Sequence, residues 1–468
     1  MELNQKKVLV VGLGRTGVAA ASFLKKRGAL VTVTDSAAEQ DLAEYSQQAH
    51  QLGIKTELGH HRAETFNSSD LIVLSPGVPH TIRPITKANE NGIRIMGEIE
   101  IASRFIREPI IAVTGTNGKT TTTSLLGEML KKSGLKVFVG GNIGKPLIDY
   151  PDEKEKAQII VAEVSSFQLD TIDTFRPKIA ILLNIAEDHL DRYPDYRAYY
   201  RSKFRIFENQ DANDTAILNG SDPHIRSSAR KIKSRKLFFS ERLKKEEGAI
   251  ITDDKIVLHI KNNKFTEENF QVSRNTTCES LSIDRRDLRI PGKHNSENVA
   301  AASIAALVAG GTPQGVQSAL INFRGISHRL EYIETINAVR YYNDSKATNT
   351  AAVIRALECF NDSVILILGG RNKGGNFHAL AEAVRSHVTQ IIALGEAKND
   401  ILSSLGAIVS IKTAATMEDA VFKAAQKAVP GDVVLLSPAC ASFDMYRDYA
   451  HRGTVFTEAV KKLKKKSA

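Results

Sequence analysis

Residues 110–123 constrain the fold of this chain more strongly than any other part of its sequence. They are IIAVTGTNGKTTTT. The apolar run at 110–113 is typical of a short buried strand, a glycine-containing turn follows it, and a helical pattern begins at Lys119. A strand, a glycine-rich loop and a helix start in this order form a phosphate cradle, because backbone N–H groups and the positive end of the helix face the anion.

Lys119 and Thr120 give this loop its chemistry. The lysine adds positive charge beside a bound phosphate, and the threonine hydroxyl can ligate Mg²⁺. The usual spacing, G-x-x-x-x-G-K-[ST], has Gly where this chain has Val113, so the loop is a variant. The alternative is a plain glycine turn before an ordinary helix, which the common register of strand, glycines, lysine and threonine disfavours. The loop residues predicted to bind ATP are Gly115, Thr116, Asn117, Gly118, Lys119, Thr120 and Thr121.

The composition is that of a soluble globular protein with an ample core, because 42% of the residues are hydrophobic and 25% are charged. At roughly 150 residues per domain, the 468 residues suggest about three domains. Cys278, Cys359 and Cys440 lie far apart, which argues against a disulfide framework or a zinc site and fits a reducing compartment.

The sequence predicts a cytoplasmic protein without a membrane span. Its first residues run directly into a strand pattern without a signal-peptide layout, and no apolar stretch is long enough to cross a bilayer. The net charge of +10 hints at nucleic acid, but the basic residues are dispersed apart from a lysine-rich tail at 461–466. That tail favours a solvated helix end, so we expect no nucleic-acid partner.

Residues 7–35 have the pattern of a strand, a turn GLGRTG at 12–17, a helix at 18–27 and a second strand at 30–34 that ends at Asp35. This matches the dinucleotide-binding fingerprint, which predicts that a phosphate approaches the helix start. It does not say which nucleotide binds, and a tight turn without a ligand remains an alternative. A further strand at 71–74 ends in a loop, where open α/β sheets bind ligands.

Polar side chains follow the strands of the next predicted domain. Asn142 lies in a glycine-rich turn, Glu163 ends a buried strand, and Asn184 ends the following one, ahead of His189. A carboxylate and an imidazole at the carboxyl ends of parallel strands, beside a phosphate loop, suit a Mg²⁺–ATP site, although each alone could be structural. For residues 211–290 we expect a few surface strands and no chemistry.

The last third of the chain repeats the α/β pattern. We expect an inter-domain joint at 323–331, and strands at 339–343, 364–368, 391–394 and 433–436. Polar clusters at the carboxyl ends of several strands suit a small polar ligand, although each alone could be a turn. Before this region, Asn295 near the start of an alanine-rich helix is either a nucleotide contact or a helix cap.

Eight motifs across essentially the whole chain resemble those of the Mur ligases. In order they are TGTNGKTT, GGNIG, EVSSFQL, NIAEDHLDRY, PGKHNSEN, GISHRLE, NDSKATN and SPACASFDMY. The N-terminal GLGRTG and the C-terminal SPACASFDMYRDYAHRG are similar to the branch that adds D-glutamate. The resemblance implies three α/β domains. These are a Rossmann-like UDP-substrate domain at 1–98, a central P-loop-type ATPase domain with a mostly parallel sheet at 99–324, and a Rossmann-like amino-acid domain at 325–468.

The implied activity is that of an ATP-dependent ligase. It adds D-glutamate to UDP-N-acetylmuramoyl-L-alanine through an acyl phosphate, in cytoplasmic peptidoglycan precursor synthesis and so in cell shape and division. We expect a monomer. Another Mur-type or folylpolyglutamate-type amino-acid ligase is the alternative. An NAD-dependent oxidoreductase, suggested by the first 35 residues alone, would leave the phosphate loop without a purpose.

The resemblance also implies the site residues. The expected catalytic residues are Lys119, Glu163, His189 and Lys203. Thr120 and Glu163 would hold one Mg²⁺, while His189 and a carbamylated Lys203 would hold a second. Asn295, Arg329 and Asp344 would join the loop in binding ATP. The expected contacts of the UDP substrate are Arg15, Thr16, Asp35, Ser36, Gly77, Asn142, Ser165 and His189. Those of D-glutamate are Lys346, Thr348, Lys373, Ser442 and Tyr449, and two lysines are chemically sensible near a dicarboxylate.

Overall fold

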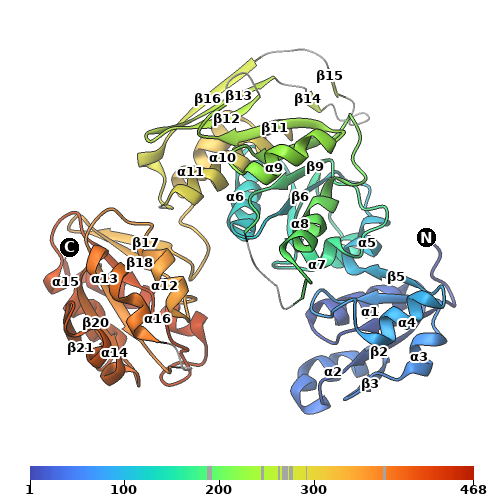
Figure 1. Cartoon of the computed structure of the whole chain (residues 1–468), viewed down its shortest axis with the longest axis horizontal. Helices are drawn as coiled ribbons and strands as arrows, with labels where there is room; N and C mark the ends of the chain where they lie inside the picture. The colour runs from blue at the N-terminus through green and yellow to red at the C-terminus, as the bar shows by residue number, and fades with distance from the viewer. Residues whose placement is uncertain are drawn as a thin grey trace. The chain divides into compact units, whose positions relative to one another are not determined.

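The computed structural model describes residues 1–186, 192–243, 247–261, 264–265, 272–273, 278–290, 292–372 and 376–467. The chain forms two compact units, Met1–Arg285 with Glu297–Ala319, and Arg286–Ser296 with Leu320–Ala468 (Figure 1). Within the described part, no helix combines the length and the apolarity that a membrane crossing requires.

The first unit begins with a five-stranded parallel sheet of order β3-β2-β1-β4-β5. Its strands are β1 Lys7–Val11, β2 Leu30–Asp35, β3 Lys55–Leu58, β4 Leu71–Leu74 and β5 Arg94–Gly97, and its helices are α1 Arg15–Lys26, α2 Ala43–Gln51, α3 Ala63–Asn67 and α4 Arg83–Glu90. Val10 packs in one core with Leu24 of α1, whereas Val11 packs in another with Phe66 of α3. Helices therefore cover both faces, which explains the continuous apolar runs of β1 and β4.

A nine-stranded sheet follows, of order β16-β13-β12-β11-β10-β9-β6-β8-β7. Its strands are β6 Ile110–Thr114, β7 Val137–Gly141, β8 Ile159–Glu163, β9 Ile179–Leu182, β10 Thr215–Asn219, β11 Arg235–Ser240, β12 Gly248–Ile251, β13 Lys255–Lys261 and β16 Cys278–Asp284. Strands from β7 to β12 along the sheet are parallel, and β13 and β16 add an antiparallel edge. A small pair, β14 Lys264–Phe265 and β15 Val272–Ser273, lies outside this sheet.

The helices of this part are α5 Glu98–Ser103, α6 Lys119–Lys132, α7 Ser166–Leu169, α8 Tyr196–Phe204, α9 Pro223–Ser228, α10 Lys293–Val308 and α11 Pro313–Asn322, with a 3-10 helix η2 at Leu147–Asp152. The prediction of only surface strands at 211–290 is wrong, because β10 is buried along its whole length and continues the central sheet. The alanine-rich helix expected near Asn295 is α10, which begins at Lys293.

The second unit contains a six-stranded sheet of order β17-β18-β22-β19-β20-β21, parallel except for the β17–β18 pair. Its strands are β17 Glu331–Ile336, β18 Val339–Asn343, β19 Val364–Gly369, β20 Val388–Leu394, β21 Ser410–Thr413 and β22 Val433–Leu436. Its helices are α12 Thr350–Leu357, α13 Ala381–His387, α14 Lys398–Leu405, α15 Met417–Lys427 and α16 Tyr449–Ser467. Leu366 packs in one core with Leu357 of α12, and Ile367 packs in another with Phe456 of α16, so both faces are covered.

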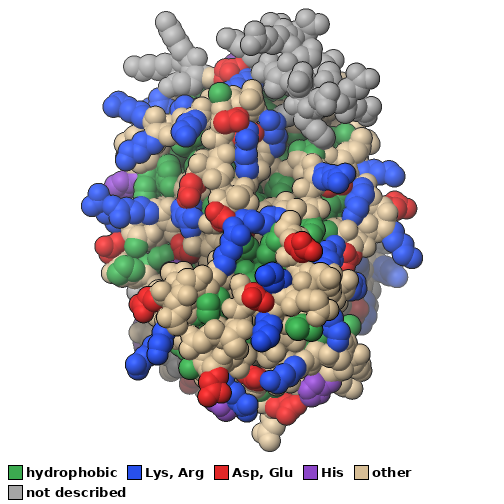
Figure 2. All heavy atoms as spheres, turned by 90° about the vertical axis from the view of Figure 1, so that its right-hand side faces the viewer, with side chains coloured by type: hydrophobic (Ala, Val, Ile, Leu, Met, Phe, Trp, Pro, Cys, Tyr) green, Lys and Arg blue, Asp and Glu red, His purple; other side chains and the backbone are tan. Residues whose placement is uncertain are grey.

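The expected α/β class with mostly parallel sheets is confirmed. The predicted strands at 71–74, 339–343 and 433–436 coincide with β4, β18 and β22. The domain boundaries at 98/99 and 324/325 stay predictions. On the face drawn in Figure 2, Lys and Arg side chains lie interspersed with Asp and Glu.

Candidate functional site

The loop between β6 and α6 has the backbone of a phosphate cradle. Gly118, the residue before α6, has φ +82°, and a Cβ atom there would lie 2.2 Å from Oδ1 of Asn298. Its N-cap residue, Gly118, provides no side-chain cap for the start of α6. The first N–H groups of a helix lack intrahelical acceptors, and the helix dipole favours an anion at this end.

The ammonium group of Lys119 lies over the same loop. Its Nζ donates to the carbonyl oxygens of Gly115 and Thr116, each at 2.8 Å. These bonds hold the lysine beside the helix start, where a phosphate would compete for the same charge. Thr120 and Thr121 follow in the first turn of α6 and are partly exposed.

Asn184, which follows β9, braces the loop from the neighbouring strand. Its backbone oxygen accepts the N–H of Thr116 at 2.9 Å, and its Oδ1 accepts the N–H of Asn117 at 2.9 Å. The site prediction did not include Asn184 among the binding residues. Its position at the carboxyl end of a buried strand was the one sequence feature that could have indicated this contact.

Glu163 ends β8 with a buried carboxylate, only 2% exposed. Its Oε1 accepts a hydrogen bond from Nδ2 of Asn142 at 2.9 Å, while its Oε2 has no hydrogen-bond partner among the described residues. A buried carboxylate oxygen without a donor is a suitable ligand for a hard cation. The described residues contain no group of three or more His, Cys, Asp or Glu side chains that could hold a metal.

Lys203 lies on α8 and reaches the same loop from the other side. Its side chain is 1% exposed, and its Nζ donates to the carbonyl oxygen of Gly115 at 2.8 Å. The ammonium group also lies 4.6 Å from the centre of the Tyr199 ring. Lys119 and Lys203, distant in sequence, therefore meet at one carbonyl.

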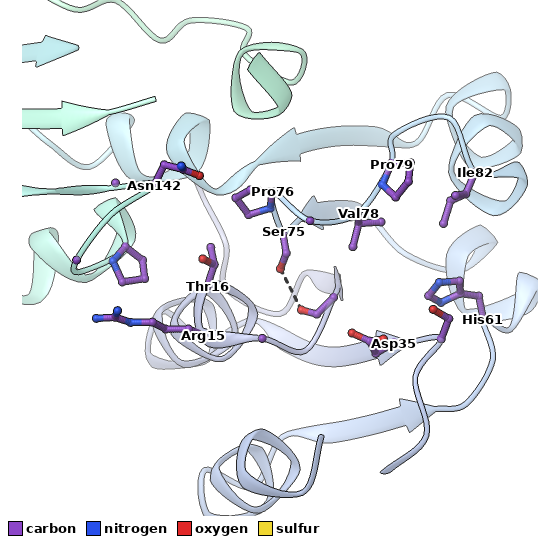
Figure 3. Close-up of a pocket in the computed structure, with 17 residues that line it drawn as sticks. Arg15, Thr16, Asp35, His61, Ser75, Pro76, Val78, Pro79, Ile82 and Asn142 are labelled. Carbon is purple, nitrogen blue, oxygen red and sulfur yellow. Dashed lines mark hydrogen bonds between the residues drawn. The ribbon is translucent and has the colours of Figure 1, made fainter. Parts of the chain in front are cut away.

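A pocket of about 570 Å³ lies between the first sheet and the glycine-rich turn after β7 (Figure 3). Six of the predicted UDP-substrate contacts line it: Arg15, Thr16, Asp35, Ser36, Gly77 and Asn142. The lining residues that the prediction missed are small or apolar, such as Pro76 and Val78, apart from the polar Ser75 and His61.

Asp35 and His61 are two polar residues that line this pocket. The carboxylate of Asp35 accepts hydrogen bonds from the N–H groups of Leu13 and Ala37, at 2.7 and 2.9 Å. Asp35, a predicted contact of the UDP substrate, therefore also holds the turn that contains Leu13 in place. Burial lowers the pKa of His61, whose Nδ1 lies 3.1 Å from Oγ1 of Thr34. The neutral ring can therefore accept or donate a single hydrogen bond to a ligand.

Asp344 directly follows β18 in the second unit. It is 8% exposed, and burial raises its pKa to about 7, against the opposing effects of the Ser437 hydroxyl and the charge of Arg329. Oγ of Ser437 donates to Oδ2 at 2.8 Å. Two residues predicted to bind ATP, Arg329 and Asp344, are thus close enough to interact.

Two of the predicted D-glutamate residues, Lys346 and Tyr449, lie close together in the second unit. Nζ of Lys346 lies 5.1 Å from the centre of the Tyr449 ring, whereas Ser442 is buried and Thr348 is exposed. The prediction missed Arg452, a fully buried guanidinium that donates to Oγ of Ser345 at 2.9 Å.

The remaining predicted site residues either lie outside the described residues or have other structural surroundings. His189 and Lys373 lie outside the described residues. Asn295 belongs to the second unit and is buried near the start of α10. Ser165 accepts the N–H of Gln168 at 3.3 Å in a capping box at α7. This helix cap occupies the side chain that was predicted to contact the UDP substrate.

Three family models match the chain in order. They are the MurD-like N-terminal domain of Mur ligases at residues 6–97, the Mur ligase middle domain at 113–306 and the glutamate ligase domain of Mur ligases at 328–440. The chain belongs to the Mur ligase family. As a Mur ligase, it carries the phosphate loop in the middle domain and the 570 Å³ pocket against the N-terminal domain.

Full-length relatives show to which Mur ligases this chain is similar in sequence. The chain is 50% identical to the UDP-N-acetylmuramoylalanine–D-glutamate ligase of Desulfosudis oleivorans, over 99% of this chain and 98% of that protein. It is 47% identical to the ligase of the same name from Desulfatibacillum aliphaticivorans, over 99% and 100%. Among solved structures, the UDP-N-acetylmuramate–alanine ligase MurC of Thermotoga maritima shares the fold, with a TM-score of 0.54 and 20% identity over 98% of this chain and 100% of that one.

Proposed function

We propose that this Mur ligase is an ATP-dependent enzyme that joins D-glutamate to UDP-N-acetylmuramoyl-L-alanine, acting as a monomer in cytoplasmic peptidoglycan precursor synthesis. The observation that carries the proposal is 50% identity, over nearly the whole of both chains, to a protein named as that ligase. The uncapped, lysine-bearing loop before α6 supports the use of ATP.

The chemistry follows from the poor electrophilicity of a carboxylate. An oxygen of the alanine carboxylate attacks the γ-phosphorus of ATP, ADP leaves, and an acyl phosphate forms. The amine of D-glutamate then attacks the carbonyl carbon, the new amide forms, and inorganic phosphate leaves with the electron pair of the broken C–O bond. The protein contributes positioning and charge neutralisation.

The proposed phosphate contacts are Lys119 and the loop residues Gly115, Thr116, Asn117, Gly118, Thr120 and Thr121. Mg²⁺, when bound, neutralises negative charge on the phosphates. Thr120 and Glu163 are proposed to hold one ion, since the buried Oε2 of Glu163, which lacks a hydrogen-bond partner among the described residues, fits a hard cation. His189 and a carbamylated Lys203 are proposed to hold the second, and Asn295, Arg329 and Asp344 to contact ATP.

The substrates would take two further sites. The 570 Å³ pocket is large enough for much of a UDP-sugar, and its backbone turn at Gly12–Gly14 with α1 suits a diphosphate. For D-glutamate, Lys346 and Lys373 would face the two carboxylates, with Thr348, Ser442 and Tyr449 around them.

A thermal-shift experiment tests the two nucleotide sites. UDP and ATP–Mg²⁺ should each raise the melting temperature of the protein, because a ligand that binds only the folded state stabilises it. NAD should not. Stabilisation by NAD without stabilisation by UDP would contradict the proposal and favour the oxidoreductase alternative.

A further inference from the structure

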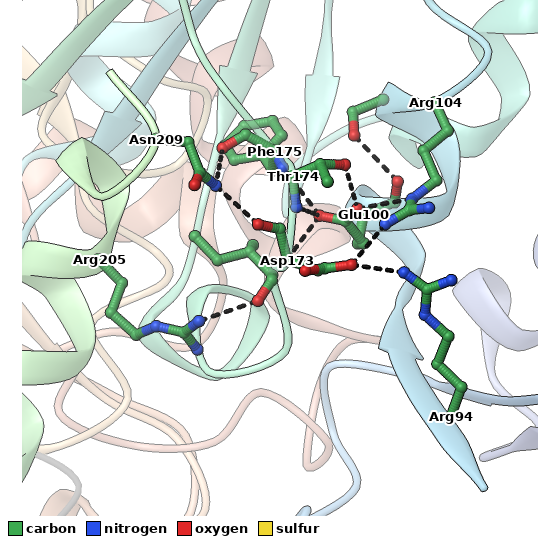
Figure 4. A network of polar contacts seen from close by, with 10 residues as sticks. Arg94, Glu100, Arg104, Asp173, Thr174, Phe175, Arg205 and Asn209 are labelled. Carbon is green, nitrogen blue, oxygen red and sulfur yellow. Dashed lines mark hydrogen bonds and ion pairs between the residues drawn. The ribbon is translucent and has the colours of Figure 1, made fainter. Parts of the chain in front are cut away.

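The segment of residues 169–175, which begins at the last residue of α7 and leads towards β9, is held on one side by Glu100 of α5 (Figure 4). Oε2 of Glu100 accepts the backbone N–H groups of Asp173, Thr174 and Phe175 at 2.9, 3.0 and 2.9 Å. Its Oε1 accepts hydrogen bonds from Oγ1 of Thr174 and from Nε of Arg104, both at 2.7 Å. The carboxylate is 0% exposed, and although burial alone raises its pKa, these donors outweigh burial and hold the pKa below its ordinary value.

Arg205, which directly follows α8, holds the same segment on the other side. Its Nη1 donates to the carbonyl oxygens of Leu169 and Asp170 at 2.8 and 2.7 Å, and its Nη2 donates to that of Ile172 at 2.9 Å. Carbonyl groups at the end of a helix lack intrahelical donors, so the planar guanidinium satisfies a set of groups that would otherwise need water.

Lys203 lies two residues before Arg205, and its neighbour Ser202 is tied to the same part of the chain. Oγ of Ser202 donates to the carbonyl oxygen of Ser166 in α7 at 2.8 Å. The residues on both sides of Lys203 are therefore bonded to α7 or to the segment after it. The place of Nζ, 2.8 Å from the carbonyl oxygen of Gly115, depends on where that segment lies.

We propose that Glu100 and Arg205 are positioning residues for Lys203, with residues 169–175 acting as a rigid strut between α5 and α8. The inference rests on the proposed function only in giving Lys203 a part in the reaction. A carboxylate that accepts five hydrogen bonds in a buried place fixes the segment, and a displacement of about 1 Å at a reacting group can cost on the order of a hundredfold in rate.

Hydrogen exchange tests the strut without any turnover. In Glu100→Gln, the new NH₂ group faces the donors Thr174 Oγ1 and Arg104 Nε, so the grip weakens. We expect the amides of α8 to exchange at least about tenfold faster, while those of α6 keep their wild-type rates. Arg94→Gln is the matched control, because it removes only an exposed ion pair to Asp173 of the same segment and should leave α8 unchanged. Unchanged protection of α8 in Glu100→Gln, with faster exchange at 173–175, would overturn the proposal.

Kinetics supply the second readout. Glu100→Gln and Arg205→Lys should each lower kcat roughly tenfold or more while KM for the UDP substrate stays within about twofold. The kcat of the double variant should fall by a factor smaller than the product of the factors for the two single variants, because both residues act through the same segment. Multiplicative losses, or a rise in KM alone, would contradict it. Should Glu100→Gln not fold, Arg205→Lys carries both readouts. If the wild-type protein showed no ligase activity, that result would contradict the proposed function instead. The hydrogen-exchange experiment would still test whether residues 169–175 hold α8 in place.

Discussion

Lys203 places its amino group in the interior of the protein. The side chain is 1% exposed, and its ammonium group bonds to the Gly115 carbonyl of the phosphate loop. An ammonium group there would repel a Mg²⁺ ion bound at the loop. Reaction of the neutral amine with CO₂ would replace it with a carbamate, an anion with two hard oxygens that suit Mg²⁺.

We predict that Lys203→Ala folds but loses nearly all ligase activity, and that formate or acetate partly restores it by occupying the vacated anionic position. The measurement is phosphate release with and without the added carboxylate, with chloride as the salt control. Arg201→Ala, at an exposed position of the same helix, should retain wild-type activity. Full activity of Lys203→Ala without added carboxylate would rule out the carbamate.

Glu98, the first residue of α5, is a second buried titratable residue. It is 1% exposed, its Oε1 accepts the N–H of Ile148 at 2.7 Å, and its Oε2 has no hydrogen-bond partner among the described residues. Burial raises its pKa to about 7, and the charge of Asp149 adds to this, while the N–H of Ile148 opposes it. The group therefore protonates near neutral pH.

This shift predicts a pH dependence of stability. Between the ordinary pKa near 4.5 and about 7, the folded protein binds more protons than the unfolded chain, so the free energy of unfolding falls as the pH rises. The full loss above pH 7 is about 3 kcal/mol, from about 1.4 kcal/mol per pKa unit. The melting temperature of Glu98→Gln should therefore fall less between pH 5 and pH 8 than that of the wild type. Equal falls in the melting temperatures of the two proteins would contradict a raised pKa of Glu98 in the folded protein.

Single residues differed in how well the sequence predicted them. The loop from Gly115 to Thr120 was predicted from local spacing, because the cradle is built from consecutive residues. The helical pattern around Lys203 alone does not predict its burial, and only the family resemblance assigned this lysine to the site. Asn184 was missed as a contact because its partner is a loop some seventy residues away.

At the scale of elements, the turn after β7 connects the 570 Å³ pocket to Glu163, which we propose as a metal ligand. Gly141 has φ +96°, and a Cβ atom there would lie 2.4 Å from the backbone oxygen of Glu163. Its neighbour Asn142 bonds to Glu163 through both its backbone N–H and its side chain. Because of these two hydrogen bonds, we expect a displacement of the turn at 141–142 to displace the carboxylate of Glu163 as well.

We predict that Gly141→Ala weakens binding of the UDP substrate and lowers activity at least about tenfold, because both the left-handed φ and the clash with Glu163 displace the turn. The control is Gly134→Ala, which has a similar φ of +87° but open space around the added Cβ. It should lose stability by about 1–2 kcal/mol and keep its affinity for the UDP substrate. Similar affinities in the two variants, measured by calorimetry, would contradict the role of the turn.

Elements with continuous apolar runs were predicted well, as for β4 and β22, since parallel strands are buried on both faces. The strands at 211–290 were underestimated. There, short apolar runs between charged turns resemble surface strands, and only pairing with β9 shows that β10 lies inside the sheet.

At the scale of the whole molecule, the order of motifs predicted the family and three α/β parts, because each part is built from local strand–loop–helix patterns. Which residues group into compact units depends on distant contacts instead. The first residues of α10 belong to the second unit while its remainder belongs to the first, and no local pattern predicts this division.

The central claim is the reaction itself, and a phosphate-release assay on the purified protein tests it most directly. We predict release only when ATP, Mg²⁺, UDP-N-acetylmuramoyl-L-alanine and D-glutamate are all present, with omission of any one reducing the rate to background. Equal rates with L-glutamate would contradict the stereochemical part of the account. Release with meso-diaminopimelate or L-alanine in place of D-glutamate would contradict the account as a whole and favour another amino-acid ligase.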